Sequence, residues 1–173
     1  MQQLTSDKAP VHMTTPPDLI DNLVADWRRE RPASDAEAMQ VVGRIIRLGR
    51  VYEQEASQLL RTHGMSYSDF DVLATLRRAG PPYESVPSRL QHNVLLTSGA
   101  MTACLRRLEC AGLIERGTSP DDRRKLSARL TPKGFAMVEE LIDARFALAR
   151  QSLAGLGADQ IAAVEAALRR LGR

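Results

Sequence analysis

Long apolar runs, an export signal and a set of paired cysteines are all missing from this sequence of 173 residues. The longest apolar run spans only a few residues, whereas a helix needs about 20 to cross a bilayer. The N-terminus lacks the basic and then apolar pattern of an export signal. The two cysteines, Cys104 and Cys110, lie six residues apart and make no disulfide framework. We therefore expect a cytoplasmic protein that does not bind membranes.

Signatures of catalysis and of cofactor binding are also missing. The chain has no G-x-G-x-x-G, no P-loop, no G-x-S-x-G and no pair of carboxylates placed for acid–base catalysis. Its histidines, His12, His63 and His92, are too scattered to share a metal ion. We therefore expect neither an enzyme nor a bound metal or cofactor.

Aromatic residues are scarce, at 4% of the chain, whereas alanine, leucine and arginine are abundant. Such a composition favours helices. The hydrophobic share of 43% and the charged share of 26% are ordinary for a globular domain. A chain of this length suits one domain, or a small domain with helical extensions. We therefore predict a mainly helical protein.

The net charge of +3 is unevenly distributed along the chain. Residues 86–135 carry nine Lys and Arg against four Asp and Glu, which is a local charge of +5. The rest of the chain is slightly acidic, at −2. A basic centre within an acidic remainder is typical of a surface that binds nucleic acid, although a merely solvated surface gives the same asymmetry.

Residues 97–131 are the segment around which the chain is organised. Thr97 or Ser98 can cap a helix there, and Gly112 can end it. One face of this helix is apolar and consists of Met101, Cys104, Leu105 and Leu108. The opposite face carries small or hydrogen-bonding residues and one long cation, namely Gly99, Thr102, Ala103 and Arg106. A helix that is slim on one face can lie in the major groove of DNA. The alternative is an ordinary helix and hairpin on the surface of a domain.

Proline and capping residues divide the first 63 residues into an expected tail and two expected helices. Residues 1–17 contain three prolines among polar residues, and we expect them to form a mobile tail. A first helix is expected over residues 18–31, because the residue before a proline is disfavoured in a helix. A long second helix, capped by Ser34 or Asp35, completes the segment 18–63. We interpret this segment as helices for dimerisation and for a ligand pocket.

Residues 64–131 have the organisation of a winged helix-turn-helix. The expected elements are a helix that begins at Ser66 or Ser68 and ends at Gly80, a loop at 80–85, a helix at 86–92, the helix that begins at Thr97, and strands at 113–116 and 126–130. The two short helices joined by a tight turn are the helix-turn-helix, and the two strands form the wing.

Residues 132–173 contain two more amphipathic helices, and we interpret them as C-terminal dimerisation helices. Pro132 suits a first helical position, and the first of these helices is expected to run to about residue 154. The second carries apolar residues at the spacing of a helical seam, namely Ile161, Val164, Leu168 and Leu171. The centre of the chain is too small to bury long helices at both ends. We therefore expect their apolar faces to close on a second copy of the chain.

Three stretches resemble the consensus of a known family. FDVLATLRRAGPP, SGAMTACLRRLECAGLIERG and PDDRRKLSARLTPKG are similar to the multiple-antibiotic-resistance regulator (MarR) family of winged-helix repressors. The resemblance covers residues 44–153. The N-terminal extension, which contains DWRRERP, is similar to the urate-responsive branch of that family, in which an added first helix bears a tryptophan.

The resemblance implies a homodimer that binds a near-palindromic operator in double-stranded DNA, in association with the nucleoid. One helix of each subunit would enter successive major grooves, roughly 10 base pairs apart. Arg124 would reach into the minor groove, with Asp122 orienting its guanidinium. The residues implied at DNA are Ser98, Gly99, Thr102, Ala103 and Arg106 in the helix, and Asp122, Arg123, Arg124 and Lys125 in the wing.

The resemblance also implies a ligand site, formed by Trp27, Asp71, Arg116 and the position of Cys104. In this branch Trp27 matches a stacking tryptophan, Asp71 an acidic residue and Arg116 an arginine. Cys104 stands where the branch places a ligand-linked arginine, and Arg106 replaces an acid. A thiol cannot hold an anion as a guanidinium does. We therefore expect a small aromatic acid, such as a phenolic or indolic carboxylate, rather than urate.

Two other functions stay open at this stage. The first is a thiol redox sensor of the same fold, which would act through Cys104 or Cys110. The second is a helical dimerisation adaptor that binds only protein.

Overall fold

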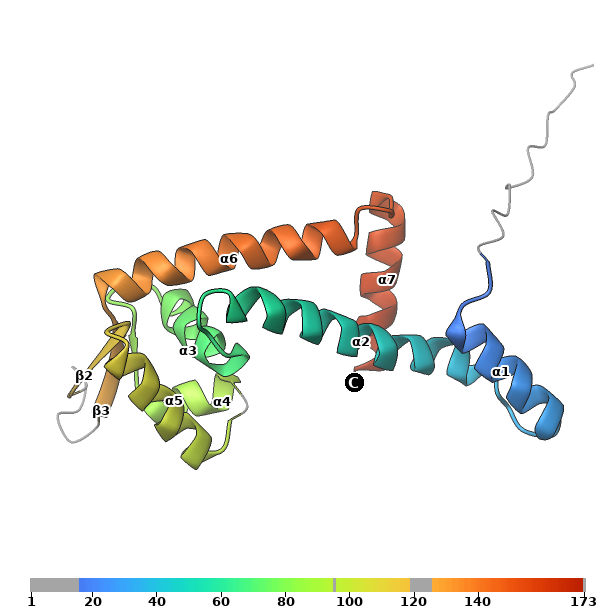
Figure 1. Cartoon of the computed structure of the whole chain (residues 1–173), viewed down its shortest axis with the longest axis horizontal. Helices are drawn as coiled ribbons and strands as arrows, with labels where there is room; N and C mark the ends of the chain where they lie inside the picture. Colours follow the sequence, from blue (N-terminus) through green and yellow to red (C-terminus); the bar gives the residue numbers. More distant parts are fainter. Residues whose placement is uncertain (1–15, 95, 119–125, 173) are drawn as a thin grey trace, which may run out of the picture. The chain divides into compact units, whose positions relative to one another are not determined.

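The computed structural model describes residues 16–94, 96–118 and 126–172, which contain seven helices and one small sheet (Figure 1). These residues form two compact units, one up to Tyr52 and the other from Glu53 onward. Helix α2 (Ala38–Arg61) includes residues of both units. The predicted fold class, mainly helical with a small β wing, is confirmed.

In the first unit, α1 (Leu19–Glu30) has almost the predicted bounds because strong signals lie at both ends. The Asp18 carboxylate accepts hydrogen bonds from the backbone N–H groups of Ile20, at 2.7 Å, and Asp21, at 3.0 Å. Arg44, on α2, pairs with both Asp18, at 3.0 Å, and Asp21, at 2.9 Å. These ion pairs fix α1 against α2.

Helix α2 begins later than the predicted caps, Ser34 and Asp35. The backbone N–H of Ser34 donates to the carbonyl of Arg31 at 2.9 Å, and that of Ala36 donates to the carbonyl of Ser34 at 3.0 Å. These turn hydrogen bonds keep the residues before Ala38 out of the helix.

The second unit contains the predicted helix-turn-helix and two C-terminal helices (Figure 1). Its helices after α2 are α3 (Tyr67–Arg78), α4 (Pro87–Val94), α5 (Ser98–Cys110), α6 (Pro132–Ser152) and α7 (Ala158–Leu171). The predicted caps Ser66 and Thr97 are confirmed, since each side chain accepts a hydrogen bond from the first turn of its helix. Gly112 has a φ of 69°, which suits the residue after a helix end.

The sheet has three antiparallel strands in the order β1-β3-β2. The strands are β1 (Glu84–Ser85), β2 (Ile114–Thr118) and β3 (Leu126–Leu130). We predicted a loop at 80–85, and this prediction is wrong at its last two residues, because Glu84 and Ser85 pair with Arg129 and Ala128 of β3. A strand this short is stabilised by its partner strand, so the local sequence gives no signal for it.

Helix α3 lies at the centre of the core and packs against α4, α5, α6 and β3. Its Val72, Leu73 and Leu76 are fully buried. The predicted apolar face of α5 is confirmed, because Met101, Cys104, Leu105 and Leu108 all lie in this core. The other face of α5 is thereby directed towards solvent.

The C-terminal helices are buried only in part. Val138 and Leu141 of α6 are fully buried, whereas Phe146, farther along the same helix, is 61% exposed. Helix α7 has no buried residue. Within the described ranges, no helix is both long enough and apolar enough to span a bilayer.

Candidate nucleic-acid interface and effector site

Helix α5 presents an open, slim face to solvent. All five residues predicted to contact DNA on this helix are exposed, namely Ser98, Gly99, Thr102, Ala103 and Arg106. The Thr102 hydroxyl donates to the Ser98 carbonyl at 2.9 Å, so it follows the helix instead of projecting from it. A side chain at Gly99 would meet nothing within 4 Å. The backbone of α5 can therefore approach a flat or grooved partner closely.

Two adjacent arginines of α5 have different surroundings. Arg107 pairs with the carboxylate of Asp69 on α3, with 2.8 Å between Nη2 and Oδ1. The Arg106 side chain is exposed, and it makes no ion pair with a described residue. Arg107 therefore fastens α5 to α3, and Arg106 is available to a partner.

Asp69 is a site residue that the sequence interpretation missed. It is 6% exposed and accepts hydrogen bonds from the Ser66 hydroxyl at 2.6 Å and the Cys104 thiol at 3.1 Å, besides Arg107. Burial acts to raise its pKa, but the hydrogen bonds from Ser66, Cys104 and Arg107 outweigh burial, so its pKa is lowered. The sequence signal was the capping pattern S-x-x-D at 66–69.

Cys104 is fully buried, with its thiol directed at Asp69. Burial, followed by the hydrogen bond to Asp69 and the charge of that carboxylate, raises the pKa of Cys104 to about 12. The thiol is therefore protonated at neutral pH, and the thiolate that reacts with oxidants is scarce. Cys110, at the end of α5, is exposed.

The base of the wing carries two ion pairs. Arg116 of β2 pairs with Glu109 of α5 at 3.3 Å, and Arg129 of β3 pairs with Glu115 of β2 at 2.6 Å. These pairs connect the strands to each other and to α5. The predicted wing contacts, Asp122, Arg123, Arg124 and Lys125, lie outside the described residues.

The structure places the four residues predicted to bind a ligand in different surroundings, and two of them already have partners. Cys104 is bonded to Asp69, and Arg116 is paired with Glu109. Asp71 is partly buried on α3, and this burial raises the pKa of its carboxyl group. The positive charges of Arg78 and Arg145 lower that pKa, but they do not cancel the effect of burial. Trp27, in the first unit, is 54% exposed.

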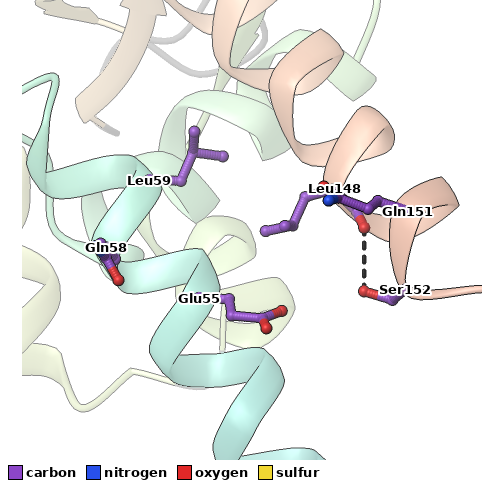
Figure 2. Close-up of a pocket in the computed structure, with 6 residues that line it drawn as sticks. All are labelled: Glu55, Gln58, Leu59, Leu148, Gln151 and Ser152. Carbon is purple, nitrogen blue, oxygen red and sulfur yellow. Dashed lines mark hydrogen bonds between the residues drawn. The ribbon is translucent and has the colours of Figure 1, made fainter.

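A cavity of about 480 Å³ lies between α2 and α6 in the second unit. It is lined by Glu55, Gln58, Leu59, Leu148, Gln151 and Ser152. Figure 2 shows Leu148 extending from α6 towards Leu59 of α2, with the Glu55 carboxylate directed into the same gap. Its volume lies in the range of small-molecule sites, about 300–1,000 Å³.

Comparison with known proteins finds a matching family model and similar transcriptional regulators. The family model described as "MarR family" matches residues 65–126. The transcriptional regulator PecS of Dickeya dadantii is 34% identical over 124 residues, covering 72% of this chain and 75% of PecS.

Two solved structures share the fold. A mutant of MarR from E. coli, crystallised with operator DNA, has a TM-score of 0.64 at 24% identity and covers 84% of this chain and 96% of that one. BpsR of Bordetella bronchiseptica, whose DNA binding is regulated by 6-hydroxynicotinic acid, has a TM-score of 0.64 at 23% identity and covers 76% of this chain and 92% of that one.

Proposed function

The chain belongs to the MarR family of transcriptional regulators, and from this membership we propose that it is a repressor that binds DNA as a homodimer and is released by a small aromatic acid. The resemblance predicted from the sequence is confirmed, and the similarity to PecS supports the predicted branch. Proteins of this family bind DNA and respond to ligands, and the relatives that match are regulators of transcription, which are not enzymes.

The observation that carries the proposal is the outer face of α5. Its exposed Ser98, Gly99, Thr102 and Ala103 let the helix backbone approach base edges, and Arg106 adds a long cation at the same face. Arginine commonly makes paired hydrogen bonds to guanine in the major groove. In a two-fold dimer, two copies of α5 would read half-sites of a near-palindrome roughly 10 base pairs apart. By the resemblance, Arg123 and Lys125 would contact the flanking phosphates, and Arg124, oriented by Asp122, would reach into the minor groove.

The exposed apolar residues of α6 and α7 support the homodimer. Phe146, Leu153, Val164, Leu168 and Leu171 are each at least 39% exposed in the single chain. Large apolar side chains that stay exposed along two helices are typical of a protein–protein interface. A second copy would cover it, and two recognition helices would then be held at a fixed separation.

A small aromatic acid is the effector class that we propose. One neighbour in fold, BpsR, has its DNA binding regulated by 6-hydroxynicotinic acid. Trp27 and Asp71 are our proposed contacts by resemblance. The acid would favour a dimer whose recognition helices no longer match the groove spacing, because it binds that state more tightly.

Removing Arg106 tests the assignment of α5. Arg106→Ala should weaken binding to the operator by about 1–3 kcal/mol and reduce the salt dependence of binding, because one cation per subunit leaves the DNA. Fluorescence anisotropy with labelled operator at several salt concentrations measures both. Arg169→Ala is the matched control, since it removes an exposed arginine of α7 that pairs with Glu165. Equal affinities and equal salt slopes for the wild type and Arg106→Ala would remove this face of α5 from the DNA interface.

A further inference from the structure

We propose that Asp69 sets the position of the recognition face of α5, by holding Cys104 and Arg107 of that helix from behind. The recognition face is the exposed side of α5 described above, namely Ser98, Gly99, Thr102, Ala103 and Arg106. This inference rests on the proposed function, because it concerns the helix that would read DNA. Asp69 and Arg107 are positioning residues: they do not touch DNA, and they act on sequence recognition through the placement of α5.

The two oxygens of the Asp69 carboxylate bond to different helices. Oδ1 accepts hydrogen bonds from the Cys104 thiol, at 3.1 Å, and from Nη2 of Arg107, at 2.8 Å. Oδ2 accepts from the hydroxyl of Ser66, at 2.6 Å, and from the backbone N–H of Ser66, at 3.2 Å. One oxygen therefore belongs to the cap of α3, whereas the other holds α5.

The two donors of α5 are placed to fix this helix in two directions. Cys104 and Arg107 lie three residues apart, on successive turns of one side of α5. Because both meet the same buried oxygen, they resist rotation of the helix about its axis and sliding along it. The apolar contacts of α5 resist these movements less, because the hydrophobic effect is not directional.

Both donors are next to the recognition face. Ala103 and Arg106, which immediately precede them in the sequence, are exposed on that face. A rotation of α5 by about 20° would move a side-chain tip, which lies roughly 5 Å from the helix axis, by about 2 Å. Binding groups need to be held within about 0.5 Å of their productive positions. Loss of the contacts with Asp69 should therefore impair base recognition while the unit stays folded.

Arg107 is engaged although its side chain is 54% exposed. The hydrogen bond to Asp69 raises the pKa of Arg107, so its guanidinium stays charged and paired. A guanidinium held in this way neutralises Asp69 instead of a phosphate. Arg106 lies on the recognition face, so the two adjacent arginines of α5 have different roles.

The test compares the binding of the full-length chain to two duplexes by fluorescence anisotropy. One is the inverted repeat that the wild type selects from random duplex DNA, and the other is a scrambled duplex of the same length. The decisive variant is Asp69→Asn/Arg107→Met, which keeps the net charge of the wild type because it removes one charge of each sign. We expect its preference for the inverted repeat to fall by about fivefold or more, because at least one base contact is misplaced. Its salt dependence on the scrambled duplex should match that of the wild type, whereas Arg106→Ala should lower that dependence.

Arg77→Met/Glu139→Gln is the matched control. It removes an ion pair of 2.7 Å between α3 and α6, and it leaves the contact between α3 and α5 in place. We expect this control to keep the full preference, at a temperature where thermal unfolding shows every variant to be folded. Arg107→Met alone changes a half-exposed residue, so it gives the same readout of preference if the double variant does not fold. Arg107→Lys should restore part of the preference that Arg107→Met loses.

Three results would overturn the inference. The first is an unchanged preference in the folded Asp69→Asn/Arg107→Met variant, or in Arg107→Met if only that variant folds. The second is a salt dependence of the double variant that is lower by one contact per subunit, because Arg107 would then bind a phosphate. The third is an equal loss in the Arg77→Met/Glu139→Gln control, because any weakening of the unit would then be sufficient. In all three cases the preference of the wild type leaves the proposed function standing, whereas a wild type that prefers no duplex would refute the proposed function itself.

Discussion

Gly134, in the first turn of α6, lies close against the backbone of Leu113. A Cβ atom at this position would lie 1.9 Å from the carbonyl oxygen of Leu113 and 2.8 Å from its carbon. The same junction is held by Thr131, whose backbone N–H donates to the Leu113 carbonyl at 3.1 Å. The Thr131 hydroxyl also donates to the Gly112 carbonyl at 2.8 Å and accepts from the Gly134 N–H at 3.0 Å. Gly134→Ala should therefore break the connection between α6 and the turn that follows α5.

The expected loss follows from these distances. An ordinary contact is 3.4 Å or more, so the two backbones must separate by roughly 1.5 Å. Overpacking of this kind costs about 1–3 kcal/mol. Loss of the Thr131–Leu113 hydrogen bond adds about 1 kcal/mol, and the better helix propensity of alanine returns up to about 1 kcal/mol. The net destabilisation is about 1–4 kcal/mol, or roughly 2–16 °C in Tm.

Urea and thermal denaturation at one fixed protein concentration measure this loss, because the stability of the proposed dimer would depend on concentration. Gly99→Ala is the matched control: the glycine lies in the first turn of α5, and its added methyl group would meet nothing within 4 Å. We expect this control to unfold as the wild type does, or slightly later. A loss below about 0.5 kcal/mol for Gly134→Ala would refute the close approach of α6 to Leu113.

The remaining predictions concern the buried cluster behind α5. In the native protein, a thiol reagent should modify exposed Cys110 rapidly and buried Cys104 only after denaturation, since burial and Asp69 raise the pKa of Cys104 to about 12. Equal rates for both thiols in the native protein would contradict the buried position of Cys104. Because the pKa of Asp69 is lowered in the folded state, its ionised form stabilises the fold above the ordinary aspartate pKa of about 3.9, and this contribution is lost as pH falls through the lowered value. Asp69→Asn should thus be less stable at pH 7 and lose less stability on acidification, as urea titrations across pH 2–7 will show; parallel acid profiles for both proteins would argue against the cluster.

Much of the local structure could be predicted because its signals are local. Asp18, Ser66 and Thr97 cap the helices that follow them, and Gly112 takes the positive φ that ends α5. The apolar face of α5 could be assigned from its spacing alone. Strand β1 could not be predicted, because its two residues are ordered by pairing with β3.

The site could be predicted only in part, because spacing along one helix does not tell which residues of another helix face it. The interpretation of α5 found its exposed residues but not that Arg107 meets Asp69 across the contact with α3. Cys104 could be recognised as an unusual residue, but its hydrogen bond to Asp69 depends on the same packing.

The most direct test of DNA recognition by α5 is selection of bound sequences from a pool of random duplex DNA, with the wild type and Arg106→Ala in parallel. We predict that the wild type enriches one inverted repeat whose half-sites lie roughly 10 base pairs apart, and that Arg106→Ala relaxes the preference at matching positions of both half-sites. A pool that stays random after repeated selection at low salt would contradict sequence-specific binding by this chain.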